Sequence, residues 1–240
     1  MDLSRKKLWA LLTGACATVS LAVGLGGCAV TSGPSGSALR DHAQAYLDAV
    51  ASGDASRALE LSDEIDGESL RGQPVSDVLL TDAVLGGATE RISDVQIQSV
   101  RVNNAIQGEQ GSSATDGSVS VTFVLDSETR RGSLGYRYVD GRWSLREGLI
   151  GYLALPCYPS SGVPLQIDGA NVDLSGVTTT PGTQPGCEAR SLALFNAVYH
   201  VRAVPGPTVE IVGSLPLEKK IVLAGVFPAA SFEVPIRPGR

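Results

Sequence analysis

The N-terminal leader decides where this chain folds. Three basic residues, Arg5, Lys6 and Lys7, precede a run from Leu8 to Leu25 that contains no charged residue. A short apolar run after a basic segment is typical of a secretory signal peptide. The run is marginal as a permanent span, because a transmembrane helix needs about 20 predominantly apolar residues. We therefore predict a signal peptide over residues 1–27 and folding of the remaining chain outside the cytoplasm.

The leader ends at Leu25-Gly26-Gly27-Cys28, which resembles the lipobox of bacterial lipoproteins. In such proteins the cysteine thiol is alkylated with diacylglycerol and becomes the new N-terminus after cleavage, and two acyl chains give stable anchoring. The resemblance implies that Cys28 anchors the protein to the extracytoplasmic face of the cell membrane. An uncleaved anchor, or a secreted protein with an incidental cysteine, is the alternative. The lipidated cysteine and a flexible tether rich in Gly and Ser occupy residues 28–37.

The composition is that of a folded, acidic protein. Apolar residues make up 43% of the chain and charged residues 18%, which excludes a largely disordered chain. The chain has 19 Lys and Arg residues against 25 Asp and Glu residues, a net charge of −6. A protein that binds nucleic acid needs a basic surface to displace the counterions of the phosphates, so we predict no nucleic-acid partner.

The four cysteines reduce to one pair. Cys16 lies in the leader and Cys28 is the predicted lipidation site, which leaves Cys157 and Cys187. Outside the cytoplasm two remaining cysteines favour a disulfide over a metal half-site. Closing a loop of about 30 residues should stabilise the fold by roughly 3–4 kcal/mol on the chain-entropy model. The alternative is a free thiolate nucleophile, although no histidine lies near either cysteine in the sequence.

The exported part divides by composition near residue 150. Residues 38–150 are acidic, whereas residues 151–240 carry balanced charge and more proline. At the start of the first segment, apolar residues recur at helical spacing until Gly53: Leu39, Ala43, Tyr46, Leu47 and Val50. We predict a second short helix capped by Asp54 and a third from Ser76 to Leu85.

The period then changes to two, which predicts strands near Val95–Val102, Val119–Leu125 and Leu134–Tyr138. The parity slips between Ile97 and Val100, which indicates a bulge. Asp140-Gly141 predicts a two-residue hairpin turn before a last strand with Trp143 and Leu145.

Helices followed by a curved antiparallel sheet predict an α+β fold. The stretches Ala38–Leu59 and Asp140–Leu145 resemble NTF2-like (cystatin-like cone) domains of exported bacterial proteins. The resemblance covers residues 38–150 and implies a helix-lined cone that holds a small ligand or serves as a spacer. Similar modules occur beside some cell-wall transpeptidases and in envelope lipoproteins of high-GC Gram-positive bacteria.

Residues 151–240 predict a small all-β sandwich-like domain that contains the disulfide. Its apolar runs are short and separated by Pro and Gly, a spacing that favours a β-sandwich or barrel. The predicted strands are Val163–Ile167, Ala197–Val204, Thr208–Val212, Lys220–Leu223 and Phe232–Ile236. A stretch within this part, Leu194–Val201, resembles strand entries in small β-domains that accompany NTF2-like domains.

Few residues could carry catalysis. The chain has two histidines. His42 lies on the apolar face of the first helix, either at the margin of the core or pointing into the cone, and His200 is expected on a solvated strand face. Some NTF2-like enzymes use an Asp or His inside the cone as a general base, so Asp41, His42 and Tyr46 are the possible cone-pocket residues. There is no Gly-x-Ser-x-Gly motif, and we predict no catalytic residue.

Metal and cofactor signals are weak. A run of acidic residues could bind calcium but lacks the EF-hand spacing, so a solvated turn is the favoured interpretation; the run is Asp63, Glu64, Asp66 and Glu68. No zinc spacing and no phosphate-binding loop is present, so we predict no metal and no cofactor. The aromatic residues of the predicted strands form either a platform for a sugar or peptide or, as we favour, a packing face; they are Phe123, Tyr136, Tyr138 and Trp143.

Together these features predict a lipid-anchored extracytoplasmic binding or scaffold protein of the bacterial cell envelope. Its partners would be the membrane, through the diacylglyceryl group at Cys28, and an envelope protein or cell-wall component. One alternative is a cone-pocket enzyme of isomerase or hydrolase type that uses Asp41 or His42. Another is an accessory factor of peptidoglycan assembly, by analogy with the transpeptidase-associated modules.

Overall fold

The computed structural model describes residues 34–62, 74–103, 115–159, 163–182, 187–205, 209–211, 217–225, 228–233 and 236–238. Residues 32–240 form one compact unit. The leader and Cys28 lie outside the described residues. Within the described part, no helix is both long enough and apolar enough to cross a membrane.

Three helices occur among the described residues, and each begins at a polar cap. Helix α1 (Gly36–Ser52) is capped by the Ser35 hydroxyl and ends at Gly53, whose φ of 89° is in the left-handed region that glycine adopts without strain. Helix α2 (Ala55–Glu60) is capped by the Asp54 carboxylate, which accepts a hydrogen bond from Arg57 N–H at 2.8 Å. Both helices confirm the prediction from spacing and caps.

The third predicted helix is wrong at its start. Helix α3 spans only Asp82–Gly87 and is capped by Thr81. The residues before it form a two-residue strand, β1 (Val75–Ser76), which pairs in parallel with Ser191 and Leu192. Pairing with a strand more than 100 residues away decided the conformation of this segment, which local spacing could not show.

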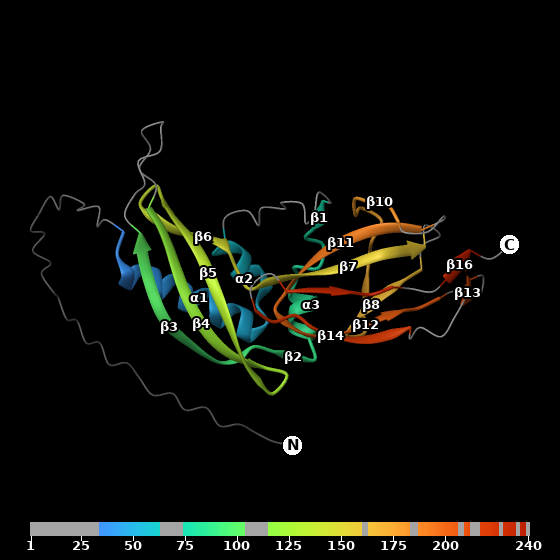
Figure 1. The fold of residues 1–240 in the computed structure, drawn as a ribbon, viewed down its shortest axis with the longest axis horizontal. Helices are drawn as coiled ribbons and strands as arrows, with labels where there is room; N and C mark the ends of the chain where they lie inside the picture. Colours follow the sequence, from blue (N-terminus) through green and yellow to red (C-terminus); the bar gives the residue numbers. More distant parts are fainter. Residues whose placement is uncertain are drawn as a thin grey trace, which may run out of the picture. The chain divides into compact units, whose positions relative to one another are not determined.

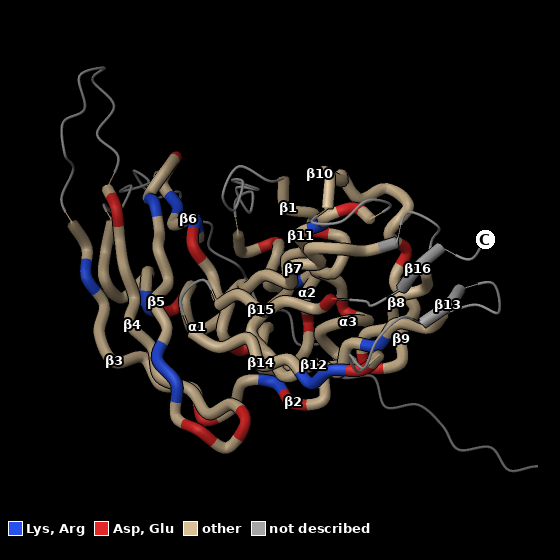
Figure 2. Tube along the Cα trace, turned by 45° about the vertical axis from the view of Figure 1, so that its right-hand side comes forward, with Lys and Arg blue, Asp and Glu red and all other residues tan. Residues whose placement is uncertain are grey.

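A four-stranded antiparallel sheet follows the helices, in the order β3-β4-β5-β6. Its strands are β3 (Ser93–Asn103), β4 (Thr115–Leu125), β5 (Glu128–Val139) and β6 (Arg142–Glu147). The register shifts between Ile97 and Ser99, which confirms the predicted bulge. Asp140 and Gly141, both with positive φ, form the predicted turn between β5 and β6. Helix α1 lies against one face of this sheet (Figure 1), and basic positions are distributed along β3, β5 and β6 (Figure 2).

The rest of the chain forms three further sheets. In the first, the order is β1-β11-β7-β15, with β10 beside β11. In the second, the order is β14-β12-β8-β9, with β2 beside β12, and the third pairs β13 with β16. The strands are β2 (Glu90–Arg91), β7 (Ile150–Pro159), β8 (Leu165–Ile167), β9 (Ala170–Val172), β10 (Thr180–Pro181), β11 (Cys187–Phe195), β12 (Ala197–Ala203), β13 (Val209–Ile211), β14 (Glu218–Val222), β15 (Ala229–Ser231) and β16 (Ile236–Pro238).

The predicted fold class, an α+β NTF2-like cone followed by a small β-sandwich, is wrong. The described residues are mostly strand, they are distributed over four sheets, and α2 and α3 have six residues each. A single long helix on one sheet does not make a helix-lined cone. The resemblance was based on the order of local elements, and it carried no information about strands that pair across the whole chain.

The strands β7 and β11 explain much of the difference between the predicted and the observed fold. β7 and β11 pair with each other over most of their length in the middle of a five-stranded sheet. Five consecutive residues at the end of β11, Ser191–Phe195, are all buried. A strand buried on both faces shows no alternation of polar and apolar residues, so the period of two that marks a half-buried strand is absent.

The core runs without interruption from α1 to the strands after residue 150. It includes Leu39 and Tyr46 of α1, Phe123 of β4, Leu155 of β7 and Val201 of β12. The predicted boundary falls at the first residues of β7, and two strands from before it, β1 and β2, pair with β11 and β12 after it.

Candidate functional site

The three predicted cone-pocket residues have different surroundings. Asp41 is exposed and His42 is half-buried on α1, whereas Tyr46 is fully buried. The His42 ring meets the Tyr136 ring edge-on, with 5.5 Å between the centroids. The Tyr46 hydroxyl accepts a hydrogen bond from the Leu149 backbone N–H at 3.0 Å. Tyr46 therefore belongs to the core, and its hydroxyl is hydrogen-bonded to the backbone.

Burial also sets the acidity of the phenols near α1. It raises the pKa of Tyr46 far above its ordinary value, although the hydrogen bond from Leu149 acts in the opposite direction. Burial likewise raises the pKa of Tyr136, and a nearby charge on Tyr46 would raise it further. Both phenols are neutral at physiological pH because an anion would lose its hydration in the apolar core. Neither hydroxyl can serve as a base there.

The aromatic residues of the sheet form a packing face, as predicted. Phe123, Tyr136 and Trp143 are buried, and all three belong to the continuous core that α1 shares. Tyr138 is half-buried and meets Trp143 at 5.1 Å in an edge-on arrangement. Aromatic rings buried in this way contribute packing energy and leave no open platform for a sugar or a peptide.

The predicted disulfide is present. Cys157 of β7 and Cys187 of β11 are bonded, with 5.0 Å between their Cα atoms. Their two strands are antiparallel neighbours, and the bond lies close to the end of the pair, where Cys187 is opposite Pro159. The bond therefore closes a chain segment of 30 residues that contains β8, β9 and β10.

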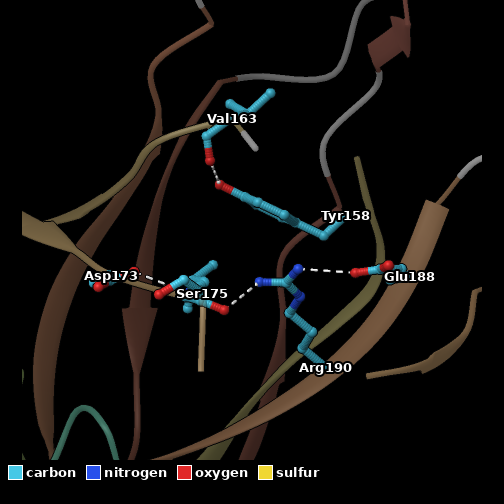
Figure 3. Close-up of polar contacts among 7 residues, drawn as sticks. Tyr158, Val163, Asp173, Ser175, Glu188 and Arg190 are labelled. Atoms are coloured by element: carbon cyan, nitrogen blue, oxygen red, sulfur yellow. Dashed lines mark hydrogen bonds and ion pairs between the residues drawn. The ribbon is translucent and has the colours of Figure 1, made fainter. Parts of the chain in front are cut away.

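A largely buried arginine lies three residues after Cys187 on β11, and sequence reasoning missed it. The Arg190 side chain is only 11% exposed, and its guanidinium pairs with the Glu188 carboxylate at 2.8 Å (Figure 3). The guanidinium also donates to the Leu174 carbonyl at 3.0 Å and lies over the Tyr158 ring, 5.6 Å from its centroid. The Tyr158 hydroxyl in turn donates to the Val163 carbonyl at 2.5 Å. We call these five residues the arginine cluster.

The arginine cluster ties a long connection to two strands. Leu174 and Val163 belong to the segment between β7 and β10, whereas Tyr158 and Arg190 belong to β7 and β11. Burial raises the pKa of Tyr158, and the adjacent Arg190 charge lowers it in part. The cluster thus joins a guanidinium, its paired carboxylate, a phenol and two backbone carbonyls, and these contacts hold the connection against the two strands. Tyr158 directly follows Cys157, Glu188 directly follows Cys187, and Arg190 comes two residues after Glu188. This proximity to the cysteines was the one signal in the sequence.

The remaining sequence candidates lie apart from the arginine cluster. Asp168 lies in the turn between β8 and β9, and its carboxylate accepts hydrogen bonds from the Thr89 hydroxyl at 2.6 Å and the His200 N–H at 3.1 Å. The His200 side chain is 42% exposed, as predicted, and lies 3.5 Å from Glu218. The acidic run of residues 63–68 lies outside the described residues. Within the described part, no three His, Cys, Asp or Glu side chains are placed to hold a metal ion.

The fold and these contacts define a mostly β protein that contains one disulfide and a largely buried arginine. No protein-family model matches the chain, and no curated protein matches it. Among solved structures, the chain is similar to one titled "The Bacillus anthracis TIE protein", with 13% identity over 61% of this chain and 35% of that chain, and a TM-score of 0.22. This chain thus matches little more than a third of that protein, and a TM-score this low carries no argument about fold or function.

Proposed function

We propose that this protein is a lipid-anchored, extracytoplasmic binding or scaffold protein of the bacterial cell envelope, without catalytic activity. The observation that carries the location is the disulfide between Cys157 and Cys187. Disulfides persist in oxidising surroundings and are rare in the reducing cytosol. A chain that contains such a bond in its core region needs a route out of the cytoplasm, and the charge-free leader after Arg5, Lys6 and Lys7 supplies one.

The anchor follows from the position of Cys28. It comes three residues after the apolar run, in a sequence similar to a lipobox, and Cys157 and Cys187 are already bonded to each other. A diacylglyceryl group would hold the protein at the membrane surface, because two acyl chains give stable binding where one gives only marginal binding. Confinement at a surface raises the effective concentration of a partner, so a weak binding site suffices for a scaffold.

We favour a binding role over catalysis because polar groups in and near the core are already hydrogen-bonded to other parts of the protein. The buried Tyr46 hydroxyl accepts a hydrogen bond from the backbone of Leu149, and the terminal nitrogens of the largely buried Arg190 bind Glu188 and Leu174. Asp41, the carboxylate of the enzyme alternative, is exposed on α1. General acid–base catalysis requires an ionisable group that is both within reach of substrate and free to exchange a proton.

The location is tested by comparing Cys28→Ala with Cys16→Ala. We expect the wild-type protein and Cys16→Ala to be recovered from membranes with a diacylglyceryl group on residue 28, measured by mass spectrometry of the N-terminal peptide. Cys28→Ala should carry no lipid. Recovery of the wild-type protein from the cytosol with Met1 intact and with Cys157 and Cys187 reduced would refute the proposal.

The binding role is tested by His42→Gln together with crosslinking. We expect envelopes that contain the wild-type protein to yield a specific crosslinked partner, and we expect His42→Gln to retain it. Loss of a cellular phenotype in His42→Gln, with folding retained by circular dichroism, would instead favour the enzyme.

A further inference from the structure

The four-stranded sheet has an open edge at β3 (Figure 1). Its order is β3-β4-β5-β6, and among the described residues β4 is the only strand that pairs with β3. The other outer strand, β6, forms an isolated bridge with Ser62. An open edge presents unpaired backbone N–H and C=O groups, which can pair with a further strand. The 11 residues of β3 are therefore a candidate site for strand pairing.

The core face of the sheet is incompletely covered at this edge. Val100 of β3 is partly buried, whereas Val119, opposite it on β4, is fully buried. Another strand beside β3 would cover its partly exposed side chains and pair its free backbone groups. Four apolar residues of β3 are partly buried against the core in this way: Val95, Ile97, Val100 and Val102.

The bulge gives β3 a symmetrical pattern. Ile97 is opposite Val121 and Ser99 is opposite Ser120, so Gln98 is the extra residue. Ile97 and Val100 therefore contact the core together, although they are three positions apart. As a result, the four apolar positions are symmetrical about the point between residues 98 and 99, where 95 matches 102 and 97 matches 100.

This symmetry makes β3 complementary to a second copy of itself. In an antiparallel pair centred between residues 98 and 99, Val95 is opposite Val102 of the other copy. Ile97 is opposite Val100, and all four lie on the core face. In a regular strand, such a centre would match each position with one on the opposite face, so the match depends on the bulge. Bulges usually protect an edge from pairing, but this one lies at the centre of the match in both copies.

We propose that two copies of this chain dimerise through β3, which joins the four strands of each copy into one antiparallel sheet. The twofold axis passes between Gln98 and Ser99, so both copies contribute the same surface. On the exposed face, Gln96 of one copy lies opposite Arg101 of the other at both ends of the interface. This inference goes beyond the proposed function and does not depend on the anchor at Cys28.

The expected dimer is weak, because one strand pair is a small contact. Stable interfaces bury roughly 1,200–2,000 Å² in total, and smaller ones are typical of transient complexes. We therefore expect an equilibrium between monomer and dimer that depends on the protein concentration. Confinement at a membrane surface would shift it toward the dimer.

Cysteine crosslinking tests the register, with the full chain expressed in cells. Opposite residues of an antiparallel pair have Cα atoms about 4.5–5.5 Å apart, which suits a disulfide. We expect oxidation to link the chains when Gln96→Cys and Arg101→Cys are expressed together. Either variant alone should give no more dimer than the wild type, because equal positions of the two copies lie about 16 Å apart along the strands.

Sedimentation equilibrium tests the affinity, with the chain purified in a detergent of matched density. Gln96→Glu places a negative charge opposite Arg101 at both ends of the interface, and Gln96→Arg places a positive one there. We expect the first to tighten the dimer and the second to weaken it, each by roughly 2- to 30-fold for two cross-strand pairs. Combining Gln96→Arg with Arg101→Glu should restore the dimer.

Arg131→Gln is the matched control. It changes the net charge by the same amount as Gln96→Glu, and Arg131 is exposed on β5, two strands away from the open edge. Its dimerisation constant should equal that of the wild type. Circular dichroism should show that all variants fold, since Gln96 and Arg101 are exposed.

The contrary outcomes are distinct. A monomer at every concentration, or a mixture of the two cysteine variants that does not crosslink, would refute the inference. A dimer that is indifferent to Gln96→Arg forms through another surface and would also refute it, as would a tighter dimer in Arg131→Gln. If the chain carries no lipid but dimerises in this register, the proposed anchor fails and the inference stands.

Discussion

The hydroxyl of Tyr46 and the backbone N–H of Leu149 form a hydrogen bond of 3.0 Å inside the apolar core. It joins the middle of α1 to the connection between β6 and β7, 103 residues away in the chain. Helix α1 thus depends on a residue that only the folded chain brings near. Because the Tyr46 hydroxyl has this one hydrogen bond among the described residues, replacing Tyr46 by Phe removes the bond alone.

Replacing Tyr46 by Phe should lower the free energy of unfolding by about 1–3 kcal/mol, because the Leu149 N–H is left buried without an acceptor. Tyr136→Phe is the matched control, since no described residue forms a hydrogen bond with the buried Tyr136 hydroxyl. It should cost less than Tyr46→Phe or stabilise the protein slightly. Urea unfolding of both variants measures the difference, and equal losses would show that the hydrogen bond contributes nothing specific.

The same phenols predict a loss of stability at alkaline pH. Burial raises the pKa of Tyr46 and Tyr136 above their ordinary value of 10.0. The folded state therefore holds these protons more tightly than the unfolded state, so their contribution is complete below pH 10.0 and is lost as the pH rises through the folded pKa. The free energy of unfolding should fall above about pH 10, and less steeply in Tyr46→Phe than in the wild type. An identical pH dependence in both proteins would contradict the assignment.

Removing the disulfide should destabilise the fold. The double variant Cys157→Ser, Cys187→Ser opens a loop of 30 residues, and the chain-entropy model gives a loss of roughly 3–4 kcal/mol. Urea unfolding of the variant should match that of the reduced wild-type protein. A double variant as stable as the oxidised protein would show that the closed loop does not constrain the unfolded chain.

Replacing Arg190 by Met should cost about 1–3 kcal/mol, because Leu174 loses a donor and Glu188 loses its partner in a largely buried setting. The matched control is Arg57→Met. The Arg57–Glu60 pair has the same 2.8 Å separation but is exposed on α2, with side chains 53% and 65% exposed. Exposed pairs of this kind contribute about 0.3–0.5 kcal/mol. Thermal and urea unfolding should show the larger loss for Arg190→Met, and similar losses would place Arg190 among ordinary surface charges.

Several local features could be predicted from the sequence because their causes are local. The apolar spacing of Leu39 and Tyr46 predicted α1, and the Asp140-Gly141 pair predicted the turn between β5 and β6. The start of α3 and the strands β7 and β11 could not be predicted in the same way. Val75 and Ser76 became a strand through a distant partner, and Ser191–Phe195 are buried throughout.

The candidate site was predicted only in part. Cysteine use led to Cys157 and Cys187 by elimination, since the other two cysteines lie at the leader. Arg190 was missed because an arginine in a sequence looks the same whether it is solvated or buried. The burial of Arg190 depends on its contacts with Tyr158 and Leu174, which lie 32 and 16 residues away in the sequence. The pairing of β7 with β11, and the connection between these strands, bring the two residues to Arg190.

The sequence by itself determined the first two helices, the β5–β6 turn and the disulfide pairing. Each depends on residue types at short spacing or on a count of cysteines. The tertiary structure alone decided that the protein is mostly β, with strands β1 and β2 paired to the second half, and that Arg190 is largely buried. Strands pair through backbone groups that every residue carries, so the sequence does not specify the partner of a strand until burial of the whole core selects it.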